Sequence, residues 1–488
     1  MNNEIAQLEP RELWTNFAAL NTVPRASKKE EQVIAFMMDF AAKLSLDTYK
    51  DETGNIIIRK PATTGLENAK TVVLQSHLDM VHQKNNDTEF DFSAQGIKML
   101  TDGDWVVAEG TTLGADNGIG VAAIMAILAS TEIAHPAIEA LFTVDEETGM
   151  TGAMGLKAGV LKGEILLNLD TEQDNEIDIG CAGGIDVTAT KTYTKETAPE
   201  TSIAYLITVG GLQGGHSGMD IHKGFGNANK IMNRILFQAE KHAGLRISNL
   251  QGGSLRNAIP RESVAQAVID SDKETAFLQC IQVAVDDIKS EYRSTEPSLE
   301  ITLEKQDVVP ACVMPVAEQK AFIQAIYAAH NGVYKMSAEL EDLVETSNNI
   351  ARVSVDKGSI SIKCLTRSSV ESSKFDLANA LRAAFELMGC EVEFSGSYPG
   401  WTPNPDSGIL KLLTSVYEKQ NNAKADVVAC HAGLECGILG RNYPKIDMIS
   451  FGPTILGAHS PAERVSISSV QKFWKFLLEV LANIPAKA

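Results

Sequence analysis

The sequence lacks any long hydrophobic run. Its longest strongly apolar stretch covers residues 121–129, far short of the ~20 residues that cross a bilayer. The opening segment, MNNEIAQLEPRELW, also lacks the basic start and apolar core of a signal peptide. We therefore expect a cytoplasmic protein with no membrane partner.

Basic residues are scarce relative to acidic ones. The 488-residue chain has 43 Lys and Arg against 63 Asp and Glu, a formal net charge of −20, and it contains no basic run. Nucleic-acid binding depends on clustered positive charge. The charge balance therefore predicts no nucleic-acid partner.

Cysteines are few and unpaired in the sequence. There are seven of them, an odd number, widely scattered and without a C-x-x-C pair. A disulfide framework or a thiolate zinc site requires paired cysteines. We expect reduced thiols, as in a cytosolic protein.

The first third of the chain has an α/β pattern. Short apolar strands are predicted within residues 70–79, 137–147 and 163–172, and an uncharged apolar helix within residues 117–131. Strands that alternate with helices favour a sheet covered on both faces. The last ~90 residues return to this pattern, and a chain of this length exceeds the ~250–300 residues of one core.

The middle of the chain differs. It alternates polar-faced strands with amphipathic helices near residues 274–292, 316–328 and 373–388. Segments 247–270 and 346–366 share a strand-turn-strand plan that a helix follows, which suggests an internally duplicated ββα, ferredoxin-like unit.

These patterns predict two domains. Residues 1–185 and 398–488 would form a discontinuous α/β catalytic domain, with a mixed, mostly parallel sheet flanked by helices. Residues 186–397 would form an inserted α+β lid domain.

Side chains that bind metals occur where the early strands end and in two loops. They are His77, Asp79, Asp116, Glu146, Glu147, Asp170 and His459. A single histidine at a strand end is commonly structural, and an aspartate before a helix is an ordinary cap. Their convergence on the ligand-binding edge of an α/β sheet is what favours a site.

The donor types indicate the metal. Nitrogen and oxygen ligands without cysteine suit Zn²⁺, Mn²⁺ or Co²⁺. Two imidazoles with several carboxylates exceed the needs of one catalytic zinc and suit two metals that share a carboxylate. Asp79 can orient His77 from two residues away. Of Glu146 and Glu147, adjacent but differently directed, one can bind metal while the other acts as general base.

Five ordered motifs carry a family resemblance. SHLDMV, GADNGIG, DEETGMTGA, NLDTE and GAHSPAERV resemble those of the di-zinc metallopeptidase family of carnosinases, aminoacylase, bacterial tripeptidase and succinyl-diaminopimelate desuccinylase. The resemblance implies that His77 and Asp170 bind one zinc and that Glu147 and His459 bind the other. Asp116 would bridge the two, followed by a cis peptide bond. Glu146 would be the general base, with Asp79 orienting His77.

The same resemblance implies substrate-binding residues in the lid. His216, in GGLQGGHSGMDI, would polarise the scissile carbonyl, and Asn257 and Arg367 would bind the substrate carboxylate. His431, in CHAGLECGIL, would line a specificity pocket or serve the structure. Each also has an ordinary reading as a polar residue of a turn or strand end.

The likeness is strongest to Xaa-His dipeptidases of this family and extends over essentially the whole chain. It implies a cytosolic homodimer that joins through the lid, holds two zinc ions replaceable by cobalt or manganese, and cleaves dipeptides such as β-alanyl-histidine. A tripeptidase or N-acyl-amino-acid deacylase is the alternative within the family. The alternative to an enzyme is a catalytically inactive homologue that binds peptides.

Overall fold

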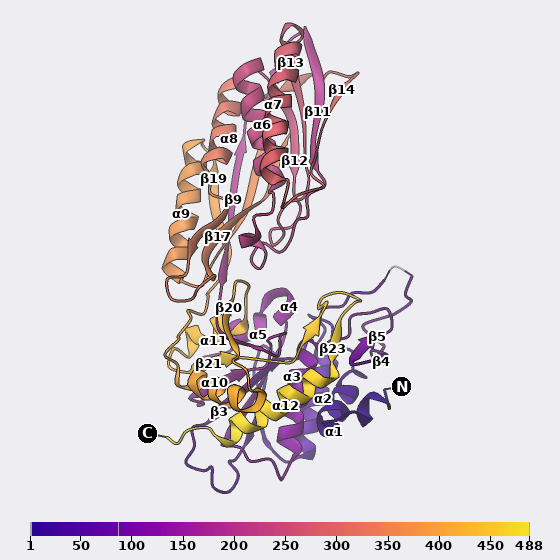
Figure 1. Cartoon of the computed structure of the whole chain (residues 1–488), viewed down its shortest axis with the longest axis vertical. Coiled ribbons are helices and arrows are strands. Elements are labelled where there is room, and N and C mark those ends of the chain that lie inside the picture. The colour runs from indigo at the N-terminus through magenta and orange to yellow at the C-terminus, as the bar shows by residue number, and fades with distance from the viewer. Residues whose placement is uncertain (1, 86, 488) are drawn as a thin grey trace. The chain divides into compact units, whose positions relative to one another are not determined.

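The computed structural model describes residues 2–85 and 87–487, and the chain divides into two units (Figure 1). The flanking unit comprises Met1–Gly180, Trp401–Ala429 and Leu434–Ala488, and the inserted unit comprises Cys181–Gly400 and Cys430–Gly433. The sequence placed residues 183–185 in the first domain. In the structure they start a strand, β9 (Gly183–Thr192), whose pairing partners all belong to the inserted unit.

An eight-stranded mixed sheet forms the centre of the flanking unit. Its strands, in spatial order, are β1 (Asp47–Lys50), β2 (Ile56–Lys60), β6 (Ile138–Thr143), β3 (Val72–His77), β7 (Ile165–Asn168), β21 (Asp447–Ser450), β8 (Glu176–Cys181) and β20 (Asp426–Cys430). The central pairs β6–β3, β3–β7 and β7–β21 are parallel, whereas the pairs β1–β2, β2–β6 and β21–β8 are antiparallel. The predicted mixed α/β class is confirmed.

Helices cover this sheet. They include α1 (Arg11–Leu20), α2 (Glu31–Lys43), α3 (Ala115–Ala129), α10 (Gly408–Asn421), α11 (Glu435–Asn442) and α12 (Ile467–Ala482). Almost every residue of α3 is buried, as expected of a helix that is apolar on all sides, and α3 packs between α1 and β3. The parallel strands end at one edge, so the residues that follow β3, β6 and β7 lie close together.

A separate four-stranded sheet supports the last of the predicted ligands. It consists of β22 (Ile455–Leu456), β23 (Arg464–Ser466), β5 (Trp105–Ala108) and β4 (Met99–Asp102), in this order. His459 lies in the turn between the paired strands β22 and β23.

The inserted unit is an antiparallel sheet with helices on one face (Figure 1). Its strands, in spatial order, are β14 (Glu300–Gln306), β11 (Ser202–Gly210), β13 (Ser263–Asp270), β12 (Arg246–Gly252), β17 (Val344–Asp356), β18 (Ser359–Ser368), β9 and β19 (Glu391–Tyr398), with β16 (Gly332–Met336) beside β17. Its helices are α6 (Ala228–Ala243), α7 (Glu274–Tyr292), α8 (Val316–Ala328) and α9 (Glu371–Leu387).

The two halves of this sheet contain similar series of strands and helices. In one half the chain order is β11-α6-β12-β13-α7-β14, and in the other it is β9, then α8-β17-β18-α9-β19. The similar segments in the sequence correspond to β12-β13 and β17-β18, each followed by a helix. The halves meet where β12 pairs antiparallel with β17.

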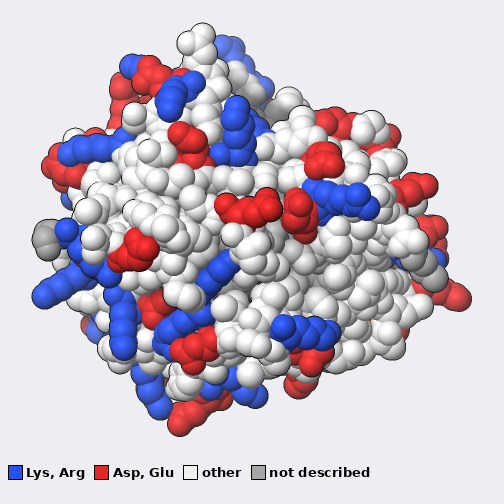
Figure 2. All heavy atoms as spheres, turned by 90° about the horizontal axis from the view of Figure 1, so that it is seen from below, with Lys and Arg blue, Asp and Glu red and all other residues white. Residues whose placement is uncertain are grey.

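Charge is dispersed on the molecular face in Figure 2, where Lys and Arg side chains are interspersed with Asp and Glu among broad uncharged areas. Among the described residues, no helix is long and apolar enough to span a membrane. None of the seven cysteines, all of which lie in the described residues, forms a disulfide bond.

Candidate active site

Elements far apart in the sequence bring the five predicted metal ligands together in the flanking unit, with Asp79 and Glu146 beside them. His77 ends β3, and Asp79 follows it two residues later. Glu146 and Glu147 open the short helix α4 (Glu146–Gly149) just after β6. The others lie just after β7 (Asp170), at the start of α3 (Asp116) and in the β22–β23 turn (His459).

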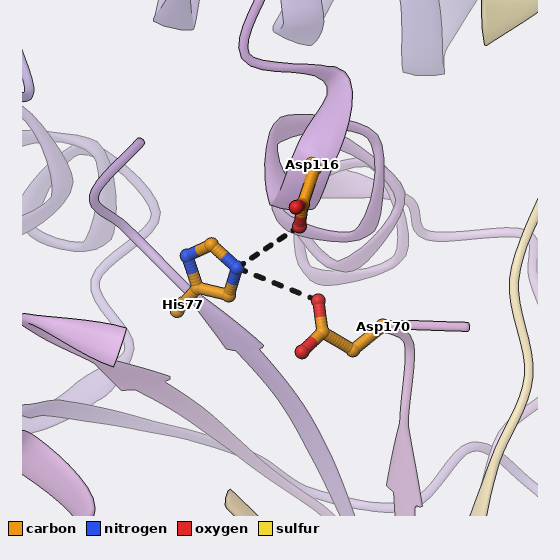
Figure 3. Close-up of side chains that lie close together, drawn as sticks. All are labelled: His77, Asp116 and Asp170. Atoms are coloured by element: carbon orange, nitrogen blue, oxygen red, sulfur yellow. Dashed lines mark hydrogen bonds and ion pairs between the residues drawn. The ribbon is translucent and has the colours of Figure 1, made fainter. Parts of the chain in front are cut away.

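His77, Asp116 and Asp170 form the first group of side chains (Figure 3). The Nε2 atom of His77 lies 3.2 Å from Asp116 Oδ1 and 3.4 Å from Asp170 Oδ1. The peptide bond between Asp116 and Asn117 is cis, as the family resemblance implied.

His459, Asp116 and Glu147 form the second group. The Nε2 atom of His459 lies 3.3 Å from Asp116 Oδ2 and 3.0 Å from Glu147 Oε2. The two carboxylate oxygens of Asp116 therefore face different histidines. This division is what a carboxylate shared by two metal ions requires.

Asp79 contacts both the first group and the helix that carries the glutamates. Its Oδ1 lies 3.4 Å from His77 Nδ1, and its two oxygens accept the N–H groups of Glu146 (3.0 Å) and Glu147 (3.2 Å). Asp79 therefore contacts both the His77 imidazole and the first turn of α4.

Carboxylates crowd one another in this buried space. Burial raises the pKa of Glu147 to about 7, and the nearby charge of Asp116 adds to the effect. Burial also raises the pKa of Glu146 well above its usual range, with Asp170 and Glu147 adding to it. Burial opposes ionisation of Asp116, but hydrogen bonds from His459 and His77 outweigh it and lower the pKa of Asp116.

These residues fit metal ions. Within each group, one nitrogen or oxygen atom of every member lies within 4.8 Å of the others. Glu147 Oε1 is buried and has no hydrogen-bond partner among the described residues, and such an orphaned acceptor is costly unless a cation or donor satisfies it. Nitrogen and carboxylate donors without sulfur suit zinc, manganese or cobalt.

The four predicted substrate-binding residues belong to the inserted unit. His216 Nε2 lies 3.4 Å from Arg367 Nη2, and Arg367 donates to Tyr398 Oη at 2.9 Å. Asn257 is exposed, and its backbone oxygen accepts the N–H of Ser217 at 2.8 Å.

His431 is buried beside this group. Its Nε2 lies 2.8 Å from Ser347 Oγ. Burial lowers the pKa of His431 to about 3, and the charge of Arg367 adds to the effect, so the imidazole is neutral at pH 7.

The sequence interpretation missed several polar residues beside the ligands. Asn117 donates to the backbone oxygen of Leu169 at 2.7 Å and to Asp170 Oδ1. Arg25 and Glu463 bind the backbone around Asp116. Little in the sequence indicated these contacts. Asn117 and Glu463 lie within the motifs GADNGIG and GAHSPAERV, but Arg25 lies in none of the five family motifs.

Comparison with known proteins assigns the family. Residues 73–483 match the peptidase family M20/M25/M40. The chain belongs to this family. It is therefore an M20 metallopeptidase, a metal-dependent hydrolase.

Two relatives resemble this M20 peptidase over nearly its whole length. The cytosol non-specific dipeptidase of Escherichia coli K12 is 42% identical over 485 residues, covering 99% of this chain and 100% of the relative. The crystal structure of aminoacylhistidine dipeptidase from Vibrio alginolyticus matches with a TM-score of 0.92 and 45% identity, covering 99% of both chains. An aminopeptidase from Bacillus cereus, at 15% identity and a TM-score of 0.57 over 98% of this chain and 99% of that one, shares the fold.

Proposed function

We propose that this protein is a dipeptidase that hydrolyses unblocked dipeptides, chiefly Xaa-His dipeptides such as β-alanyl-histidine. The similarity to two dipeptidases over 99% of the chain carries the proposal. The complete cluster of histidines and carboxylates in the flanking unit supports it. The name of the Escherichia coli relative indicates a wider dipeptide range for that protein.

Two zinc ions would occupy the cluster, with Co²⁺ or Mn²⁺ as functional substitutes. His77 and Asp170 would hold one ion, Glu147 and His459 would hold the other, and Asp116 would be shared by the two. Bound metal ions of this kind polarise a carbonyl and make water more acidic.

Glu146 is the proton carrier in this proposal. It starts the same helix as Glu147, and one of its oxygens lies within 4.8 Å of ligand atoms of His77 and Glu147. Among the described ion pairs, however, none joins Glu146 to either histidine. In this role Glu146 takes a proton from the attacking water and returns it to the leaving amine. Asp79 keeps the His77 ring and the Glu146 backbone in place.

His216 and Arg367 recognise substrate oxygens. The Nδ1 of His216 accepts the N–H groups of Gly218 (3.2 Å) and Met219 (3.0 Å), so a neutral His216 carries its proton on Nε2. That N–H and the Arg367 guanidinium are both donors, and both would hydrogen-bond to an oxygen anion. His216 would serve the scissile carbonyl, and Arg367 the substrate carboxylate.

Asn257 and His431 complete the proposed recognition. Asn257, next to the His216 segment, would assist Arg367. The neutral His431 would line the pocket that receives the C-terminal side chain of the dipeptide.

A cytosolic location and a homodimer joined through the inserted unit complete the proposal. The similarity to a cytosol dipeptidase of Escherichia coli supports the location. Size-exclusion chromatography with light scattering tests the assembly, and a monomer would contradict it.

A substrate panel combined with metal analysis tests the function. β-Alanyl-histidine, other Xaa-His and Xaa-Xaa dipeptides, Gly-Gly-Gly and N-acetyl amino acids are compared with and without a chelator. We expect dipeptide hydrolysis that a chelator abolishes and zinc restores. Preference for Gly-Gly-Gly or acylated amino acids would favour the tripeptidase or deacylase. Peptide binding by metal-loaded protein without cleavage would favour the inactive homologue.

A further inference from the structure

Two buried charged side chains enclose the loop that carries Asp116. Glu463 is 2% exposed and lies four residues after His459, in the loop between β22 and β23. Arg25 is also 2% exposed and follows α1. They approach residues 113–116 from chain segments that are about 350 and 90 residues away in the sequence.

Glu463 satisfies the backbone donors of this loop. Its Oε2 accepts the N–H groups of Leu113 (2.7 Å) and Gly114 (2.9 Å). Its Oε1 accepts those of Ala115 (2.8 Å) and Asp116 (3.2 Å). One carboxylate therefore holds four consecutive N–H groups and ties the His459 turn to the Asp116 backbone.

Arg25 joins the same loop to the His77 segment. Its guanidinium donates to the backbone oxygens of Leu78 and Asp79, both at 3.1 Å, and to that of Gly114 at 2.5 Å. Gly114 has a φ of 70°, and a Cβ there would lie 2.8 Å from Met80 Sδ and closer still to Arg25. The fit between the loop and Arg25 leaves no room for a side chain.

These contacts exceed what packing alone requires. A buried guanidinium or carboxylate is costly unless its hydrogen bonds are made. Here both Nη atoms of Arg25 and both oxygens of Glu463 bond to the backbone next to two ligands, His77 and Asp116. Of the polar side-chain atoms of these two residues, only Arg25 Nε is buried without a hydrogen-bond partner among the described residues. His77 and Asp116 are 3.2 Å apart at their nearest polar atoms, so a small backbone shift changes how Asp116 divides its oxygens between the histidines.

We propose that Arg25 and Glu463 are positioning residues that set the spacing of the two metal sites by fixing the His77 and Asp116 backbones from opposite sides. Glu463 further couples Asp116 to His459. The inference rests on the proposed two-metal site. Outer residues of this kind typically change metal affinity 10- to 100-fold when they are replaced.

Glu463→Gln is the first test. Glutamine keeps the size but has one acceptor oxygen, so part of the four-donor set loses its partner. Glu139→Gln is the matched control, because Glu139 is 4% exposed and accepts the N–H groups of Lys162 (2.7 Å) and Gly163 (2.9 Å) away from the ligands. We measure zinc affinity by chelator competition and the Mn²⁺–Mn²⁺ exchange coupling by electron paramagnetic resonance.

We expect Glu463→Gln to bind the more weakly held of the two metal ions 10- to 100-fold less tightly than the wild type does. Its Mn²⁺–Mn²⁺ exchange coupling should also be altered. At saturating metal, its kcat should fall with little change in KM. Glu139→Gln should retain wild-type values in all three. Arg25→Lys provides a second variant, since a single ammonium cannot reach the Leu78 and Gly114 oxygens as the guanidinium fork does. It should show the same losses.

Wild-type affinity and coupling in Glu463→Gln or in Arg25→Lys, whichever folds, would overturn the positioning role and leave the metal site standing. If neither variant folds while Glu139→Gln does, the role is structural and the inference is also overturned. If the wild-type protein itself binds fewer than two metal ions, the proposed site fails first, and this inference fails with it.

Discussion

Three consecutive acidic residues, Asp145, Glu146 and Glu147, have different surroundings although they are neighbours. Asp145 has a φ of 56°, and its oxygens accept the hydroxyls of Thr148 and Thr151 (the latter at 2.6 Å). Glu147 contacts His459, and Glu146 makes no such ion pair in the described part of the chain. In the proposed mechanism, Asp145 thus stabilises the turn, Glu147 binds a metal ion and Glu146 transfers the proton.

Replacement of the two glutamates should separate their roles. Glu146→Gln should lower kcat by at least ~10²-fold, because a positioned general base contributes that much, with two metals still bound. Glu147→Gln should instead lose metal, since it removes a ligand charge. Metal analysis of both purified variants, together with kcat at saturating zinc, checks the assignment. Near-wild-type kcat in a fully loaded Glu146→Gln would show that another group moves the proton.

Glu435 is a further buried carboxylate, located at the start of α11. It is 0% exposed, and its Oε2 accepts Gln75 Nε2 and Thr143 Oγ1, both at 2.6 Å. Burial raises the pKa of Glu435 from 4.5 to about 8. The folded protein therefore keeps this proton at pH 7, where the unfolded chain has lost it.

This raised pKa makes stability depend on pH with a definite sign. The contribution of Glu435 is fully present below about pH 4.5 and is lost as pH rises towards about 8. In the wild type, this loss lowers the unfolding free energy between about pH 4.5 and pH 8. Glu435→Gln is a neutral mimic of the protonated acid and cannot lose the proton. The fall in unfolding free energy over this range should therefore be smaller in the variant by about 1.4 kcal/mol or more. Urea titrations of metal-free protein across the range measure it. The exposed Glu132→Gln should follow the wild-type profile, and identical profiles for Glu435→Gln would contradict the prediction.

Among the elements, those with strong local patterns were predictable from the sequence. Helices near 274–292, 316–328 and 373–388 correspond to α7, α8 and α9. Helix α6 was missed, although Asn227 caps its start by accepting two backbone N–H groups and Gly244 follows its end. The glycine-rich segment before it obscured an otherwise regular apolar period.

The ligand cluster was predictable because parallel strands place their ends at one edge. The supporting residues were not, since Arg25 and Glu463 act through backbone groups of distant segments. Such contacts leave no spacing rule in the sequence. The change of pattern along the chain predicts an inserted unit that begins at residue 186, whereas β9 begins at Gly183.

Helix α3 illustrates how close packing of an element supports the site. A Cβ at Gly120 would meet Asn117 Oδ1 and would lie 2.5 Å from Ser76 Oγ and 2.9 Å from the Leu169 oxygen. These three residues immediately precede or follow ligands. The helix can approach β3 only because position 120 has no side chain.

Gly120→Ala should therefore lower the unfolding free energy by about 1–3 kcal/mol, as overpacking typically does, and weaken metal binding. Gly408→Ala is the matched control, because its Cβ would meet only Asp447 Oδ2 at 3.7 Å. That variant should stay within about 0.5 kcal/mol of wild type. The two variants are compared by thermal and urea unfolding and by metal titration. Equal stability of the two variants would show that α3 can move enough to accommodate a Cβ at position 120.

At the scale of the whole molecule, all proposed metal ligands belong to the flanking unit, whereas the inserted unit has a separate core. That core packs strands against α6–α9 through residues such as Ile207, Ile235, Phe277 and Phe385. Its first and last strands, β9 and β19, pair with Gly184 opposite Tyr398, so the chain enters and leaves at one place. The inserted unit should therefore fold without metal.

A fragment covering residues 182–399 tests this division. It should unfold cooperatively, at a temperature that neither chelator nor zinc changes. The full chain should be stabilised by zinc, by about 2.7 kcal/mol per site at a 100-fold excess over Kd, and should lose this on chelation. Calorimetry of both proteins makes the comparison. A chelator-sensitive fragment would place a metal site in the inserted unit, and an unfolded fragment would show that its core depends on the flanking unit.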